Sequence, residues 1–272
     1  MSNLIEQLSP NLVLPNKPWF HFSIDDILPS LIDVSLNNMS LFDHKLMKFM
    51  KYVYEKKGLT FDLMLFYEQT DYDGTVNNLG DIRDIRSELI EAGDFIRFGP
   101  HSLNSATPPH NQTTQDQITT FDSIFNQIDR FAGDNMRSRW VRLHFFSELF
   151  ELGSYFKKNG IEALFLTDNP VVTHRMNETC ASRIKEHGCV RYNDTNFIRT
   201  HFRLEDFPRA RLSKTDITNK FRQCLDKHGF IVMMSHEYEL TRTEVRVTLM
   251  EVLKILDELE VELYNPAFIK EV

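Results

Sequence analysis

Short apolar runs alternate along this chain with longer stretches of helical periodicity, and this alternation constrains the fold more than any other feature of the sequence. Each run is rich in Phe, Ile, Val and Leu, which is typical of strands. Strands that alternate with helices predict βαβ units and therefore a parallel sheet. The expected strands are residues 19–24, 60–67, 94–99, 139–145, 161–167 and 229–234, with weaker candidates near 197–203 and 260–264.

The segments between these runs carry apolar residues at spacings of three and four, which places those residues on one face of a helix. Leu46, Met50 and Val53 have this spacing in one segment. Another segment follows Thr241 and Glu244, which are spaced as a helix capping box. The expected helices cover about residues 79–92, 114–131, 146–159 and 214–228, together with the segments 42–53 and 249–259.

The number of strand–helix units predicts the fold class. Roughly seven or eight units in a chain of 272 residues fit an α/β fold of the barrel type. We therefore predict a single distorted (β/α) barrel of seven or eight parallel strands over residues 1–272, since no linker or internal repeat divides the chain. A doubly wound open sheet is the alternative, but it usually needs a glycine-rich turn after the first strand. Here that turn contains Asp25 and Asp26.

Composition and charge exclude several classes of protein. The chain has 31 Lys and Arg against 39 Asp and Glu, a net charge of −8, which argues against nucleic-acid binding and against a polybasic membrane contact. Three cysteines are too few for a disulfide framework. We expect no membrane span and a cytoplasmic location, because no window approaches 18 uninterrupted apolar residues and the first residues lack a signal-peptide pattern. The sequence carries no signal for the oligomeric state.

Acidic residues, histidines and an arginine gather at the ends of the expected strands. In a parallel barrel the loops that follow the strands carry the chemistry, so these side chains should converge on one rim. Arg142 and His144 are two residues apart and should share one face of their strand. The full set at the rim is Asp25, Asp26, His101, Arg142, His144, Asp168 and His236.

This set of side chains indicates metal-assisted hydrolysis of an amide or an ester. A carboxylate and imidazoles suit a divalent metal, for which zinc is the usual case. A second carboxylate can accept the proton of a water molecule, and a histidine across the site can protonate the leaving group. An arginine can hold and orient the carboxylate that acts as base.

Four motifs in order along the chain resemble those of the polysaccharide deacetylase family, the NodB-homology domain of carbohydrate esterase family 4. The segment from Ser23 to Ile27 resembles the family's T-F-D-D-G motif, and His101 with Ser102 resembles the start of H-[ST]-x-x-H. Further along the chain, Arg142 to Phe145 resembles R-x-P-[FY], and Met234 to His236 resembles L-x-H. The resemblance extends from about residue 19 to 260.

The resemblance implies a distorted barrel and the metal-dependent removal of N- or O-acetyl groups from sugars. It also implies a role for each matching residue. Asp25 would be the general base, oriented by Arg142, and His236 would be the general acid. Asp26 and His101 would be metal ligands, and Asp168 would correspond to the carboxylate that tunes the acid histidine.

The chain departs from the family pattern at the second histidine of H-[ST]-x-x-H, where Ser105 stands. Asp26 and His101 alone would make a poor site, because catalytic zinc typically has three protein ligands. Two histidines could supply the missing ligand. We expect His110, on the loop after His101, to be the ligand and His144 to line the substrate pocket, with His144 as the alternative ligand.

The expected function is therefore that of a deacetylase-like hydrolase acting on an intracellular carbohydrate precursor, with a small molecule or glycan as substrate. One alternative is a catalytically silent carbohydrate-binding barrel, which Ser105 would support. A third possibility is a glycoside hydrolase that uses paired carboxylates, with Asp25 or Asp26 opposite Asp168 or Glu237.

Overall fold

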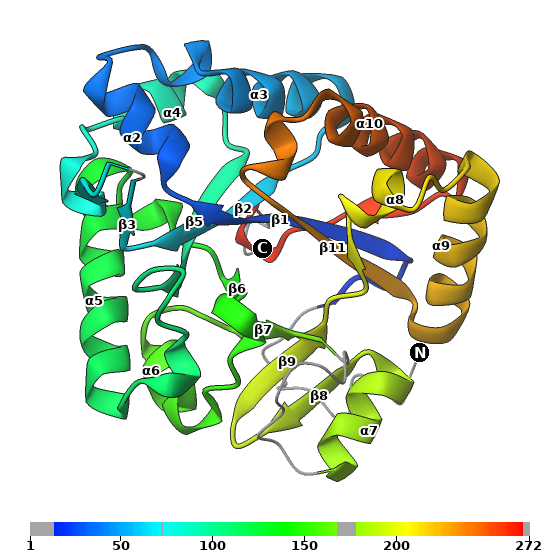
Figure 1. Ribbon diagram of the computed structural model, residues 1–272. Coiled ribbons are helices and arrows are strands. Elements are labelled where there is room, and N and C mark those ends of the chain that lie inside the picture. Colours follow the sequence, from blue (N-terminus) through cyan, green and yellow to red (C-terminus); the bar gives the residue numbers. More distant parts are fainter. Residues whose placement is uncertain (1–13, 72, 168–177, 269–272) are drawn as a thin grey trace.

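The strands of the computed structural model pair mainly in parallel and form two larger sheets and one two-stranded sheet (Figure 1). The structure describes residues 14–71, 73–167 and 178–268. The order in the larger sheet is β10 (Phe202–Arg203), β11 (Phe230–His236), β1 (Trp19–Ile27), β2 (Phe61–Phe66) and β5 (Ile96–Ser102), and β12 (Glu262–Leu263) also pairs with β1. The order in the smaller sheet is β6 (Trp140–Val141), β7 (Ala163–Leu166), β9 (Thr195–Arg199) and β8 (Cys189–Tyr192), of which β8 is antiparallel to β9.

Backbone contacts connect the two sheets at both of their edges. A parallel bridge joins Phe98 of β5 to Arg137, just before β6. On the other side the chain runs from β9 into β10, and the His201 N–H donates to the carbonyl of Val232 in β11 at 2.8 Å. The predicted α/β class with parallel strands is confirmed. Within residues 14–71, 73–167 and 178–268 the parallel strands form two linked sheets rather than one continuous closed barrel sheet.

Helices surround the strands in Figure 1, where α3 and α10 lie along one side and α5 and α9 lie on opposite flanks. Parallel neighbours need such crossovers, because a tight hairpin can only join antiparallel strands. A separate antiparallel hairpin, β3 (Glu68–Thr70) with β4 (Val76–Asn78), follows β2. The helices are α2 (Pro29–Leu36), α3 (Lys45–Lys57), α4 (Arg86–Ala92), α5 (Thr114–Phe131), α6 (Gly153–Lys158), α7 (Glu178–His187), α8 (Asp206–Arg209), α9 (Lys214–His228) and α10 (Thr243–Glu258).

Side-chain caps determine where two of the predicted helices begin. The Thr113 side chain accepts from the Asp116 N–H at the start of α5, and Ser213 forms a full capping box at the start of α9. Both helices have the predicted bounds. The capping box expected at the last long helix is wrong: α10 begins after Arg242 without a side-chain cap. Thr241 instead donates its hydroxyl to the Tyr238 carbonyl at 2.6 Å.

The strand that was expected over residues 139–145 is much shorter than its sequence pattern predicts. β6 ends at Val141, and the chain then turns through a short 3-10 segment, His144–Phe146. Phe145 and Phe146 both have positive φ angles, 53° and 52°, which an extended strand cannot accommodate. Arg142 and His144 therefore do not owe their orientation to alternation along a strand.

The strands β1 and β2 carry buried side chains on both faces, which explains their continuous apolar sequence. Phe20, Phe22, Phe61 and Phe98 are among the largest fully buried side chains and anchor the core between the sheet and its helices. Within the described part of the chain, no helix has both the length and the apolar composition that a membrane crossing requires.

Candidate active site

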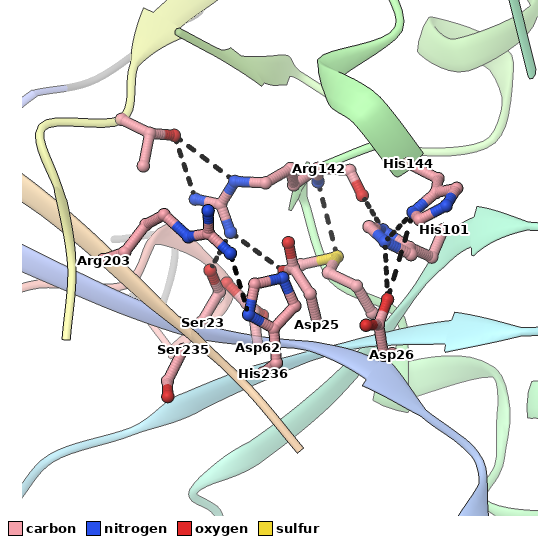
Figure 2. Close-up of polar contacts among 12 residues, drawn as sticks. Ser23, Asp25, Asp26, Asp62, His101, Arg142, His144, Arg203, Ser235 and His236 are labelled. Carbon is pink, nitrogen blue, oxygen red and sulfur yellow. Dashed lines mark hydrogen bonds and ion pairs between the residues drawn. The ribbon is translucent and has the colours of Figure 1, made fainter. Parts of the chain in front are cut away.

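A bulge at the end of β1 separates the two neighbouring aspartates. The pairing of β1 with β2 shifts register between Ile24 and Ile27, and Asp26 adopts a left-handed conformation with φ 64°. An extra residue in a strand redirects the side chains beside it. Asp25 and Asp26 therefore lie among the last residues of β1 rather than on the loop after it. Their side chains contact different partners (Figure 2).

Asp25 forms a buried ion pair with Arg142. The Arg142 Nη1 donates to Asp25 Oδ1 at 2.9 Å and to Ser23 Oγ at 2.6 Å, while Nε and Nη2 donate to Thr200 Oγ1 at 3.3 and 3.1 Å. Burial lowers the pKa of Arg142 from its usual value, and the nearby Asp25 opposes that shift. The guanidinium thus fixes one face of the Asp25 carboxylate and leaves the rest of it at the cavity.

The guanidinium of Arg142 is also enclosed by aromatic rings. Its central carbon lies 4.9 Å from the ring centre of Phe165 and 5.7 Å from that of Phe146. These contacts exclude water around the ion pair and keep the guanidinium in one orientation.

Asp26, His101 and His144 point their polar atoms toward one another (Figure 2). The His101 Nε2 lies 3.3 Å from Asp26 Oδ1, the two imidazoles approach at 3.2 Å, and His144 Nδ1 lies 3.9 Å from Asp26 Oδ1. A tetrahedral zinc site with bonds of about 2.0–2.1 Å places its ligand atoms about 3.4 Å apart. The spacing of these three atoms therefore fits such an ion.

The hydrogen bonds of the two imidazoles determine which nitrogens are free of protons. The His101 Nδ1 donates to the Arg142 carbonyl at 2.6 Å, and the His144 Nε2 donates to the Ser105 carbonyl at 3.1 Å. In the neutral tautomers, His101 Nε2 and His144 Nδ1 then carry lone pairs, and both face Asp26. Asp26 Oδ1 is buried without a hydrogen-bond donor. Three acceptors that face one another match the needs of a cation.

The electrostatics of the cluster favour a positive charge between Asp26 and His101, which either a proton on His101 Nε2 or a cation can supply. Burial opposes ionisation of Asp26, but its hydrogen bond to His101 and the charge of that ring lower the pKa of the carboxyl overall. Burial would lower the pKa of His101, but Asp26 and Asp25 raise it overall. Burial and the neighbouring His101 lower the pKa of His144 to about 4. His144 is therefore neutral at physiological pH and can offer its lone pair.

The structure does not bring His110, the ligand expected from sequence, into this cluster. Its Nδ1 lies 2.9 Å from the hydroxyl of Ser147, which in turn donates to the His144 carbonyl at 2.6 Å. His110 thus supports the turn that carries His144. The histidine grouped with Asp26 and His101 is His144, the alternative that the sequence left open. The carbonyl of Ser105, which stands where the family motif has histidine, orients the ring of His144.

His236 lies across the cavity from this cluster and is oriented by a carboxylate that sequence reasoning missed. Its Nδ1 donates to Glu205 Oε1 at 2.6 Å, which leaves Nε2 for the cavity. Burial would raise the pKa of Glu205, but the hydrogen bond from His236 lowers it overall. Glu205 follows β10 and is fully buried. The sequence carried a signal for this residue, because Glu205 and Asp206 come one residue after the weak strand candidate near 197–203. Asp168, which was expected in this role, lies outside the described residues.

Glu237 has a structural task that occupies both of its oxygens. Its Oε2 accepts from the Leu28 N–H at 3.0 Å, and its Oε1 accepts from the Ser30 N–H at 2.6 Å and from the Ser30 hydroxyl. These are free donors at the start of α2, where a carboxylate is favoured. The Glu237 N–H also donates to the Asp25 carbonyl at 3.0 Å. Glu237 therefore connects β11 to the end of β1 and is not directed at a substrate.

A second cluster of potential ligands, His201, Cys224 and His228, does not fit a metal. The Val232 N–H donates to His201 Nδ1 at 3.0 Å, so the proton of the neutral ring is on Nε2 and faces His228 Nδ1 at 2.9 Å. Burial raises the pKa of the Cys224 thiol to about 12, which disfavours the thiolate that zinc requires. Two of the three atoms that would bind the ion, His201 Nε2 and Cys224 Sγ, carry protons, and the third, His228 Nδ1, accepts the proton of His201.

The His201 ring predicts a pH dependence of stability. Burial and the neighbouring His228 lower the pKa of His201 well below 6.5, its value in the unfolded chain. The unfolded state therefore binds more protons below pH 6.5, and this contribution to stability is complete above pH 6.5 and declines as the pH falls. We expect a loss of about 2 kcal/mol between pH 7 and 5 from this group. Urea unfolding at both pH values measures this loss in the free energy of unfolding.

His201→Asn is the control, because asparagine keeps an acceptor for the Val232 N–H. This variant should show a smaller loss between pH 7 and 5. An equal loss in both proteins would contradict the assignment to His201.

Four of the candidate reacting groups line one cavity of about 640 Å³. Asp25, His101, His144 and His236 all line it, and the opening continues past β10 toward α9. Asp26 lines a second cavity of about 470 Å³ on the other side, bordered by the β3–β4 hairpin. The site is thus reached from two sides.

No protein-family model matches this sequence, and no curated protein matches it. Solved structures do share its fold. A putative polysaccharide deacetylase from Mycobacterium smegmatis is 11% identical, covers 93% of this chain and 90% of its own, and has a TM-score of 0.52. A 4-alpha-glucanotransferase from Thermococcus litoralis is 12% identical over 91% of this chain but only 37% of its own, with a TM-score of 0.51. A CE4 family pseudoenzyme from Bacillus anthracis is 12% identical over 95% of this chain and 68% of its own, with a TM-score of 0.48.

The likeness to the putative polysaccharide deacetylase confirms the fold that the motif resemblance implied. It extends over nearly the whole of both chains, as the four motifs do. At such low identity the likeness concerns the fold, and the activity has to be inferred from the site.

Proposed function

We propose that this chain is a metal-dependent hydrolase that removes an acetyl group from a carbohydrate. One observation carries the proposal: ligand atoms of Asp26, His101 and His144 face one another beside a buried Asp25–Arg142 ion pair, and both histidines line the same cavity as Asp25 and His236. The fold shared with a polysaccharide deacetylase supports it. A divalent metal held by the three ligands would supply Lewis acidity toward the acyl group, and zinc suits two imidazoles and one carboxylate.

Asp25 is placed to act as the general base. Arg142 and Ser23 hold it in position, and the carboxylate reaches the cavity next to the ligand cluster. It would take one proton from a water molecule as the water oxygen bonds to the acyl carbon. Because the Arg142 carbonyl also holds His101, one residue positions both the base and a metal ligand.

His236 is placed to act as the general acid. With Nδ1 donating to Glu205, its Nε2 would give a proton to the departing sugar nitrogen or oxygen as the bond to the acyl carbon breaks. The products are acetate and the free amine or hydroxyl. Glu205 stabilises the orientation and charge of the imidazole, which is the task of a carboxylate behind a catalytic histidine.

The paired-carboxylate alternative loses one of its candidates, because both oxygens of Glu237 bind the start of α2. Glycoside hydrolysis also leaves His101, His144 and His236 without tasks. The catalytically silent carbohydrate-binding barrel is distinguished from the hydrolase by turnover alone.

The proposal is tested by acetate release from a panel of N- and O-acetylated sugars. We expect release that a chelator abolishes and zinc restores. Asp25→Asn should lower kcat by about 10²–10⁴-fold while bound metal stays unchanged, since Asp25 is outside the ligand cluster. Metal content by elemental analysis is the matched readout. Absence of acetate release across the panel with stoichiometric metal bound would favour the silent barrel, and chelator-resistant activity would contradict the metal.

A further inference from the structure

The cavity next to His236 extends into a groove that contains two basic side chains. We call this groove the basic arm and define it by Arg203, Lys220, Asp206, Phe202, Phe207 and Leu212. Arg203 ends β10 next to the reacting histidine, and Lys220 lies further out on α9 (Figure 2 shows Arg203 beside His236). The two positive charges of this groove contrast with the net charge of the chain, which is −8.

The charge of Arg203 is only partly balanced by its neighbour. The Glu205 carboxylate accepts from His236 Nδ1 at 2.6 Å and from Ser235 Oγ at 3.0 Å. Arg203 Nε lies 3.5 Å from the same carboxylate and Arg203 Nη2 lies 3.4 Å from His236 Nδ1, both at long hydrogen-bond distance, and the side chain is 44% exposed. The guanidinium therefore keeps donors that a ligand can use, in a planar arrangement that suits phosphate and carboxylate oxygens.

Lys220 adds a second positive charge to the same groove. Among the residues that the structure places, Lys220 forms no close ion pair, and the Asp216 carboxylate one turn earlier on α9 interacts with its charge only at longer range. The acidic residue of the basic arm, Asp206, lies 3.7 Å from Arg209 instead. The walls between Arg203 and Lys220 are apolar, formed by Phe202, Phe207 and Leu212, and low-dielectric walls strengthen the attraction for an anion.

The cavity on the other side of the metal ligands has the opposite charge. We call it the acidic arm and define it by Glu68 and Asp71. Glu68 accepts from the Asn104 amide at 2.9 Å and Asp71 from the Asn77 amide at 2.7 Å, and these amides leave both charges in place. An anionic ligand is therefore repelled from the acidic arm and attracted to the basic arm. The electrostatic potential therefore increases from the acidic arm to the basic arm.

We propose that the basic arm binds an anionic substituent of the substrate, a phosphate ester or a carboxylate attached to the acetylated sugar. This inference rests on the proposed function for the identity of the sugar. Arg203 contacts the anionic group nearest to His236, and Lys220 contacts the part of the substrate further along α9. The charge then determines which end of the substrate faces each arm.

Direct binding tests this without any need for turnover. The probes are N-acetylglucosamine, its 1-phosphate and the corresponding uronic acid, titrated into the full chain by calorimetry. We expect the charged sugars to bind at least about 10-fold more tightly than the neutral one, with an advantage that shrinks as salt is raised. Lys220→Gln should reduce the advantage, and Lys220→Glu should abolish it.

Lys214→Gln is the matched control, because Lys214 lies on the same helix but pairs with Glu258 outside the groove. It should leave the advantage unchanged. An advantage for the phosphate alone identifies a phosphate ester, and an equal advantage for the uronic acid identifies a general anion site. Equal affinity for neutral and charged sugars, no binding of any charged sugar at millimolar concentration, or an advantage that survives Lys220→Glu would overturn the proposal. Charged sugars that bind but release no acetate would contradict the proposed function and leave the basic arm intact.

Discussion

Replacing His144 with alanine is expected to empty the proposed metal site. The change would leave Asp26 and His101 as the remaining protein ligands in the cluster, whereas catalytic zinc typically has three. We expect the affinity for zinc to fall by more than the about 10–100-fold that loss of a supporting partner costs. Competition titration against a zinc indicator measures the affinity, and elemental analysis after dialysis measures the occupancy.

Two further variants distinguish residues that bind the metal from residues that only position a ligand. His110→Ala removes an imidazole that contacts Ser147, so it should keep zinc at concentrations where His144→Ala is empty. Ser105→Ala should bind zinc like the unmodified chain, because only the backbone carbonyl of Ser105 contacts His144. If His110→Ala lost the metal and His144→Ala retained it, the ligand would be His110 and the placement of His144 would have another cause.

The site shows which parts of an active site a sequence can reveal. Asp25, His101 and His236 belong to strands with clear apolar patterns, so their order along the chain predicts their convergence in a parallel sheet. The order of the strands could not decide which histidine replaces the ligand that is missing at Ser105. His144 reaches the cluster through a turn with positive φ at Phe145 and Phe146, and phenylalanine carries no local signal for that conformation.

The elements of the fold also differ in whether the local sequence predicts them. The apolar strands and the long helices α5 and α9 follow from periodicity and from caps at Thr113 and Ser213. The β3–β4 hairpin, the helix α2 and the strand β8 were not predicted, because each is short and takes its stability from tertiary contacts. The bulge at Asp26 was not predicted either, since its left-handed backbone depends on neighbours far away in the sequence.

Replacing Arg142 with methionine is expected to cause the largest loss of stability of any single charge change at the site. The substitution leaves the buried carboxylate of Asp25 without its counter-charge and removes the donors to Ser23 and Thr200. Breaking a buried ion pair by removing one partner costs about 3–5 kcal/mol. Urea unfolding at neutral pH should show this loss in the free energy of unfolding.

Arg97→Met is the matched control, because Arg97 is also buried but its partner Asp94 is 67% exposed and stays solvated. It should cost clearly less. The double variant Asp25→Asn with Arg142→Met should recover part of the stability lost in Arg142→Met, since no uncompensated charge is left in the core. If the double variant were less stable than Arg142→Met by the full cost of Asp25→Asn alone, the two residues would not be coupled. Arg142 would then act through packing between Phe146 and Phe165, and Asp25 would need another group to orient it as a base.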